Sequence, residues 1–179
     1  MRLHLIRHGE STWNVEGRLQ GQTSHPRLTA RGRRQARSAA SALESTAIDA
    51  IWSSDLARAV ETAEIISEIV DTDVSTTPLL REQALGSMEG KLSKELEPLP
   101  TPDGAHISEI RWGGGESIED VHRRLSRFMD QLRAESSGEV ALVSHGDTIR
   151  VLLALLAGRS HRDVEWIPVE NGVVIPVEI

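Results

Sequence analysis

Two segments of this 179-residue chain combine residue types that suit phosphate chemistry. Arg7 and His8 end a short apolar run near the N-terminus, and His145 ends a second apolar run just before Gly146. A guanidinium binds phosphate oxygens in a bidentate manner and stays charged at any useful pH. A neutral imidazole is a competent nucleophile near pH 7. The two segments therefore indicate phosphoryl transfer through a phosphohistidine.

Two further side chains complete this chemistry if the chain folds as alternating strands and helices. Arg58 lies in the first turn of a predicted helix, and Glu82 follows the third predicted strand. Arg58 would add a second cation for the phosphate, while Glu82 in its protonated form would protonate a departing alkoxide. Ligands collect beyond the carboxyl ends of the strands in open α/β sheets, so we expect all these side chains at one edge.

The same edge is expected to need no metal. His145 and Gly146 lie where a strand turns into a helix, so free backbone amides of that turn would face the site. Gly146 would let an anion approach the backbone closely. Arginines and amides would then supply the positive charge that metal ions supply in other phosphoryl-transfer sites.

The hydrophobic pattern predicts strands that alternate with helices. Short apolar runs bounded by turn residues are typical of strands, and apolar residues spaced three and four apart are typical of helices. The predicted strands cover residues 3–7, 49–54, 74–80, 139–145 and 173–179. The predicted helices cover residues 28–46, 55–70, 117–132 and 147–157. This alternation indicates an α/β fold with a mainly parallel sheet.

Local signals refine these elements. Thr29 and Ser117 are candidate N-caps, and Asp120 stands where a capping box requires an acidic side chain. The run 139–145 is nearly all apolar, as expected of a strand buried on both faces. Pro176 suits an edge strand because proline cannot donate to a ladder on both sides.

The periodic pattern fails between residues 90 and 115. Prolines at 98, 100 and 102 and the glycine run 113–115 predict a loop or a small insertion. We expect one domain over residues 1–179, with a lid insertion at about 91–115. His106 and Trp112 flank this lid, and whether they contact the substrate stays open.

The chain resembles the histidine phosphatase superfamily, the phosphoglycerate-mutase-like group. One RHG triplet alone would be weak, but seven segments match in the family's order and span almost the whole chain. They are LIRHGESTWN, GRLQGQ, LTARGRRQA, SSDLARAVETA, LLREQALGSMEG, GGESIEDVHRR and LVSHGDTIR. The resemblance implies a doubly wound sheet with helices on both faces and an active site under a short lid.

The resemblance also implies a role for each candidate residue. His8 would be the nucleophile, and Glu82 would be the general acid and then the base that activates water. The phosphate pocket would be completed by Arg7, Arg58 and His145. Phosphate oxygens would also be held by Asn14, the Gly146 amide and, as a looser match, Gln20. Asn14 could instead cap a turn, and the nearby Glu89 is a rival acid that we expect to brace the loop.

The lid favours hydrolysis of the phosphate ester over transfer of the phosphate to another hydroxyl of the substrate. It is short compared with that of phosphoglycerate mutases and carries Glu95, Glu97, Asp103 and Glu109. A mutase must retain a doubly phosphorylated intermediate, which needs a longer and more basic lid. The leading hypothesis is therefore a metal-independent phosphatase of a small phosphomonoester without a cofactor. The alternative is a 2,3-bisphosphoglycerate-dependent phosphoglycerate mutase, and a non-catalytic phospholigand-binding protein is a weaker one.

Composition limits the partners. The formal net charge of −7 argues against a nucleic-acid binder, and the arginines of ARGRRQAR are typical of a solvated helix face. The chain has no cysteine, which suits a reducing compartment, and we expect a cytoplasmic location. No apolar run approaches the ~20 residues of a membrane helix. The expected partner is a small phosphorylated substrate, with a homodimer left open.

Overall fold

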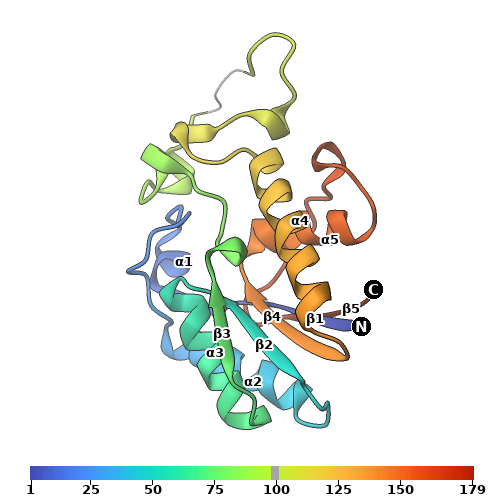
Figure 1. Cartoon of the computed structure of the whole chain (residues 1–179). Coiled ribbons are helices and arrows are strands. Elements are labelled where there is room, and N and C mark those ends of the chain that lie inside the picture. The colour runs from blue at the N-terminus through green and yellow to red at the C-terminus, as the bar shows by residue number, and fades with distance from the viewer. Residues whose placement is uncertain (98–100) are drawn as a thin grey trace.

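A five-stranded sheet forms the centre of the molecule (Figure 1). The computed structural model describes residues 1–97 and 101–179. The strands are β1 (Arg2–Arg7), β2 (Ala50–Ser54), β3 (Val74–Thr77), β4 (Glu139–Ser144) and β5 (Val174–Glu178), in the spatial order β3-β2-β4-β1-β5. The first four run parallel, and β5 pairs antiparallel with β1. The predicted mainly parallel α/β sheet is confirmed.

Helices cover both faces of this sheet, as expected for a doubly wound fold. The helices are α1 (Thr12–Glu16), α2 (Ala30–Leu43), α3 (Ala57–Val70), α4 (Ile118–Glu135) and α5 (Gly146–Leu156). In Figure 1, α2 and α3 lie on one side of the strands, and α4 and α5 lie on the other. Among the described residues, no helix is long and apolar enough to span a bilayer.

Strand β4 separates two hydrophobic cores by the alternation of its side chains. Val140 and Leu142 pack with apolar residues of α4 and α5, while Ala141 and Val143 pack with those of α2 and α3. All four are at most 1 % exposed. The prediction of a strand buried on both faces is therefore confirmed, and this rigid centre carries the segment that ends in His145.

The predicted helix caps are present. The Thr29 side chain accepts from the amide of Gly32, and Ser117 forms a reciprocal capping box with Asp120. The short helix α1 was not predicted, because five largely polar residues give no apolar periodicity. Ser11 caps it through a box with Asn14, so this helix depends on local side-chain bonds rather than on a buried face.

Strand β3 is shorter than predicted. It ends at Thr77, and Pro78–Leu80 form a 3₁₀ turn in which the Thr77 side chain accepts from the Leu79 amide. Proline lacks a ladder donor, so the strand stops before it. Strand β5 does lie at a sheet edge, and Pro176 occupies it as expected.

The segment after residue 85 extends beyond the sheet edge, at the top of Figure 1. Between residues 86 and 115, the described residues contain only single 3₁₀ turns, at Gly86–Met88, Ser93–Glu95, Ile107–Glu109 and Trp112–Gly114. Pro98 and Pro100, which helped to predict the lid, lie outside the described residues. The described parts of this segment have the irregular backbone that the sequence predicted.

Candidate active site

The two histidines meet where β1 and β4 end side by side. Arg7 and Ser144 are register partners in these strands, and the His8 amide donates to the Ser144 carbonyl at 3.0 Å. The ring centroids of His8 and His145 are 5.1 Å apart, in an edge-to-face arrangement. The side chains are 2 % and 0 % exposed. Both imidazoles are therefore close enough to contact one tetrahedral anion.

A backbone carbonyl orients the His8 ring. Its Nδ1 lies 2.7 Å from the Gly9 carbonyl oxygen, an acceptor, so Nδ1 carries the proton and Nε2 keeps the lone pair. Gly9 is itself held, because its amide donates to the Thr62 hydroxyl at 3.1 Å. A Cβ on Gly9 would lie 2.2 Å from the Gly32 carbonyl oxygen, so only glycine allows this approach to α2. The result is a fixed imidazole with Nε2 available as a nucleophile.

Burial keeps both imidazoles neutral. Desolvation, followed by the charges of Arg58 and Arg7, lowers the pKa of His8 well below 6.5. Desolvation and Arg58 lower the pKa of His145 in the same direction. The Ser54 hydroxyl lies 2.8 Å from His145 Nε2 and can donate to it. Nδ1 of His145 then carries the proton and can donate to an anion.

Arg58 is the largest fully buried side chain of the site. It lies in the first turn of α3 and donates from Nη1 to the Thr23 carbonyl at 2.9 Å and from Nη2 to the Gly21 carbonyl at 2.8 Å. Desolvation lowers the pKa of Arg58 to about 10, so it stays charged near pH 7. Backbone carbonyls thus hold the guanidinium in one orientation through Nη1 and Nη2, and Nε does not take part in these bonds.

Arg7 is held by the loop before β5. Its Nη1 donates to the Val169 carbonyl, and its main-chain carbonyl accepts from the Gly172 amide at 2.9 Å. Gly146 lies against this guanidinium, since a Cβ there would be 3.6 Å from Arg7 Cζ. The loop between α5 and β5 therefore completes the wall around Arg7 and His8.

Three buried side-chain nitrogens have no hydrogen-bond partner in the part of the chain that the structure describes. They are Arg7 Nε, Arg58 Nε and His145 Nδ1. A buried polar atom without a partner costs free energy, so such atoms are rare and concentrate where a ligand supplies the partner. All three belong to residues that the sequence assigned to the phosphate pocket. They are the donors that an oxyanion beside His8 would accept from.

Glu82 lies at the N-terminus of α5. Its Oε1 accepts from the amide and hydroxyl of Thr148 and from the Gln83 amide at 3.1–3.2 Å, and its Oε2 accepts from the Asp147 amide at 3.3 Å. The expectation that the amides of this turn are free for an anion thus needs correction, because two of them bind Glu82. A carboxylate at a helix N-terminus is favoured by the same dipole that favours a phosphate there. Oε2 is the less engaged oxygen, since the Asp147 amide is its one donor among the described residues.

Arg124 and Glu116 position Glu82, and neither was predicted from the sequence. Arg124 is 6 % exposed and donates to the main-chain carbonyls of Leu79 and Glu82 at 2.7 and 3.1 Å. Its Nε and Nη2 also bind the Glu116 carboxylate. A signal was available, because Arg124 shares the inward face of α4 with Val121 and Phe128 at helical spacing. Charged residues on such a face require partners.

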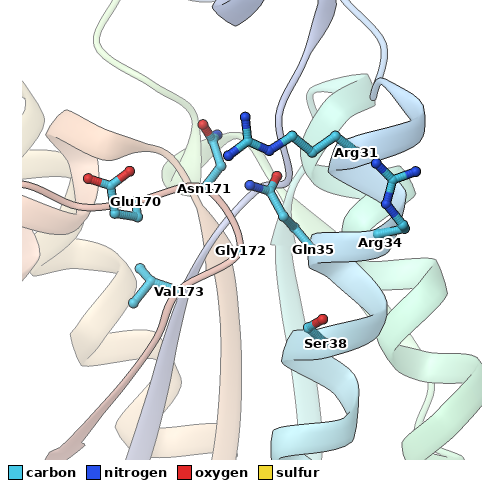
Figure 2. A pocket seen from close by; sticks show the side chains of 8 residues that line it. All are labelled: Arg31, Arg34, Gln35, Ser38, Glu170, Asn171, Gly172 and Val173. Carbon is cyan, nitrogen blue, oxygen red and sulfur yellow. The ribbon is translucent and has the colours of Figure 1, made fainter.

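Asn171 is a second missed residue. Its Nδ2 donates to the main-chain carbonyl of His8 at 2.9 Å. Figure 2 shows Asn171 in the loop before β5, on the side that faces Gln35 and Arg31 of α2. Gln35 accepts from the Glu10 amide at 2.8 Å, so both flanks of the His8 segment are held by side-chain amides. Only an Asn-Gly turn marks Asn171 in the sequence, and that pattern says nothing of chemistry.

Two further candidates for phosphate binding, Asn14 and Gln20, both contact Ser11. Its hydroxyl donates to Gln20 Oε1 at 2.7 Å and lies 3.0 Å from Asn14 Oδ1. Asn14 takes part in the capping box of α1 with Ser11, which agrees with the alternative role in capping. Contact of Asn14, Gln20 or the Gly146 amide with phosphate remains a prediction.

Glu89 braces the loop, as expected. Its carboxylate accepts from the amides of Gln22 and Leu85 at 2.9 and 3.0 Å and from the Thr23 hydroxyl at 2.9 Å. His106 lines a separate cavity of about 180 Å³ with Trp112 and residues of the 161–166 segment. Among the described residues, no group of three or more His, Asp or Glu could hold a metal ion.

This chain is similar to known proteins over nearly its whole length. A family model described as the histidine phosphatase superfamily (branch 1) matches residues 3–179. The probable phosphoglycerate mutase GpmB of Proteus mirabilis (strain HI4320) is 37 % identical over 166 residues, which cover 88 % of this chain and 75 % of the relative.

Two similar solved structures are titled as phosphatases. A mycobacterial glucosyl-3-phosphoglycerate phosphatase in complex with VO3 has a TM-score of 0.88 at 30 % identity, over 99 % of this chain and 90 % of that one. A phosphoserine phosphatase mutant from Entamoeba histolytica, in complex with phosphoserine, has a TM-score of 0.81 at 26 % identity. That match covers 98 % of this chain and 89 % of the other.

Proposed function

This chain belongs to the histidine phosphatase superfamily, and from that premise we propose that it hydrolyses small phosphomonoesters through a phosphohistidine on His8, without a metal. The observation that carries the proposal is that, among the described residues, buried nitrogens of Arg7, Arg58 and His145 have no hydrogen-bond partner. The His145 ring lies against that of His8, and the charges of Arg58 and Arg7 lower the pKa of His8. These nitrogens supply donors for the oxygens of one phosphoryl group. Two guanidinium groups provide the positive charge that the transferring group needs.

The first half-reaction transfers the phosphoryl group to the protein. His8 Nε2 attacks phosphorus in line, the N–P bond forms, and the bond from phosphorus to the ester oxygen breaks. Glu82 gives its proton to that oxygen, which leaves as the alcohol. His8 Nδ1 keeps its proton and its bond to the Gly9 carbonyl throughout, so the ring does not rotate while charge develops on it.

The second half-reaction returns the protein to its starting state. Glu82, now a carboxylate, takes a proton from water, and the water oxygen attacks phosphorus as the N–P bond breaks. Orthophosphate leaves, and Glu82 is protonated again for the next cycle. The donors on Arg7, Arg58 and His145 serve both steps, because the same three phosphoryl oxygens stay in place.

The solved neighbours are phosphatases, consistent with a phosphoric monoester hydrolase. The curated relatives are named as probable phosphoglycerate mutases, so a phosphoglycerate mutase is the second candidate. A mutase would use the same five residues, which are His8, Glu82, Arg7, Arg58 and His145. Transfer of the phosphoryl group between the two hydroxyls of phosphoglycerate, at a rate that the bisphosphate increases, would reveal a mutase. The acidic residues of the described lid support the hydrolase instead, since they disfavour retention of a bisphosphate.

The test uses 4-nitrophenyl phosphate with EDTA present. Phosphate release by the purified protein is expected, and His8→Ala is expected to abolish it. A quenched reaction should carry an acid-labile, base-stable phosphoryl group that is absent from the His8→Ala protein. Activity that disappears with EDTA and returns with a divalent cation would refute the metal-independent mechanism. Isomerisation of phosphoglycerate faster than its hydrolysis would establish the mutase.

A further inference from the structure

A mostly apolar cavity of about 310 Å³ lies near the N-terminus of α5. Five of its lining side chains are Leu19, Leu85, Met88, Leu96 and Trp112. Asp147 also lines it, and the Asp147 amide donates to Glu82 Oε2 at 3.3 Å. Asp147 therefore links the cavity to Glu82, the group that would protonate the leaving oxygen of a substrate.

Main-chain hydrogen bonds hold the walls of this cavity. The Leu19 amide donates to the Lys91 carbonyl at 3.0 Å, and the Gly90 amide donates to the Leu19 carbonyl at 2.8 Å. Glu89 accepts from the Leu85 amide and from the loop at Gln22. The apolar side chains therefore stand on a braced backbone, as in a largely preformed ligand site.

The charge of the cavity is acidic. Its described lining contains the carboxylates of Glu97 and Asp147 and no Lys, Arg or His. Asp147 pairs with Arg150, yet desolvation and then the charge of Glu82 raise the pKa of Asp147 to about 6. A carboxylate or second phosphate on the substrate would enter beside these carboxylates, and the described lining offers it no cation. The neighbouring Arg150 is already paired with Asp147.

We infer that this cavity binds the alcohol part of the substrate and selects phosphomonoesters with an apolar, uncharged leaving group. The inference rests on the proposed phosphatase function and names its substrate class. Apolar alkyl or aryl groups gain from contact with Leu85, Met88 and Trp112, by about fourfold in kcat/KM per buried methylene. Phosphoglycerate, whose leaving group carries a carboxylate, is a poor substrate on this view.

The test compares matched substrates by kcat/KM. A series from ethyl to hexyl phosphate should rise about fourfold per methylene until the cavity is filled. Glycerol 3-phosphate and 3-phosphoglycerate differ in one terminal group, and the neutral member should be at least tenfold better. Trp112→Ala should flatten the alkyl series, while Ile107→Ala, another lid residue outside this cavity, should leave it unchanged.

Asp147→Asn gives an independent arm. It keeps the shape of the side chain and removes one carboxylate, so it should narrow the preference for glycerol 3-phosphate over 3-phosphoglycerate. A flat alkyl series, or a preference for 3-phosphoglycerate in the unmodified protein, overturns the inference while phosphate release continues. Failure of the proposed function looks different, because then no ester in the panel yields phosphate.

Discussion

The phosphate pocket and the apolar cavity are linked through Asp147, whose amide binds Glu82, but they are built in opposite ways. The pocket uses the ends of β1 and β4 and the start of α3, and its His8, Arg58 and His145 are at most 2 % exposed. The cavity uses irregular segments, and its walls such as Leu85 and Trp112 are only partly buried. This difference indicates that the regular sheet positions the reacting side chains, while the loops form the surface that selects the substrate. Changes in one region should then spare the function of the other.

His8→Ala, in the phosphate pocket, is expected to have the largest effect of the substitutions that test this division of roles. Loss of the nucleophile should lower kcat by at least about 10⁴-fold on every ester, whatever its leaving group. Trp112→Ala should instead change the ranking of substrates and leave the best kcat within about tenfold. Steady-state kinetics on the alkyl series would measure both. Residual activity of His8→Ala that still follows alkyl length would mean that another nucleophile serves the site.

Glu82→Gln tests the proposed general acid, which binds the amide of the cavity residue Asp147. Loss of a general acid should cost about 10²–10⁴-fold in kcat for alkyl phosphates, whose alkoxides need a proton. The cost should be far smaller for 4-nitrophenyl phosphate, since that leaving group departs without one. An equal loss on both substrates would show that Glu82 only holds the N-terminus of α5. Glu89→Gln is the matched control and should lack this dependence on the leaving group.

Burial in the pocket predicts a pH dependence of stability. Desolvation and Arg58 hold the pKa of His8 and His145 well below 6.5, whereas both titrate near 6.5 in the unfolded chain. Below about pH 6.5 the unfolded state then binds more protons, so the unfolding free energy decreases as the pH falls. The slope is up to about 1.4 kcal/mol per pH unit for each histidine.

Urea denaturation from pH 7.5 to 5 measures this slope. Asp147 acts in the opposite sense, because its pKa of about 6 lies above that of the unfolded chain, so the comparison uses an Asp147→Asn background. His145→Gln should remove about half of the slope there. An unchanged slope would mean that His145 is not held neutral by burial.

The smallest predicted effect concerns Asn171, at the edge of the phosphate pocket. Asn171→Ala removes the donor to the His8 carbonyl and should lower kcat about five- to tenfold with little change in KM, since one neutral hydrogen bond contributes about 1 kcal/mol. Ser38 lines the same surface hollow as Asn171 in Figure 2. Ser38→Ala should leave both constants unchanged. A rise in KM alone for Asn171→Ala would place its effect on substrate binding rather than on the orientation of His8.

The convergence at the sheet edge could be predicted because it follows from topology. Arg7, His8 and His145 each follow an apolar strand, and the carboxyl ends of parallel neighbours lie together. The roles of Arg124 and Asn171 could not be predicted in this way, because each reaches a main-chain carbonyl far away in the sequence. Short-range periodicity carries no information about such pairs.

The sequence by itself determined which residues could do the chemistry and which strand ends deliver them, because hydrophobic alternation and caps are local properties of the chain. Only the tertiary structure decided that Glu82 accepts from the Asp147 and Thr148 amides of α5, and that Gly9 fixes the tautomer of His8. It also decided that leucines and Trp112 line one cavity with Asp147. These outcomes depend on packing between segments distant in sequence, where sub-ångström fit and the loss of water set the energies.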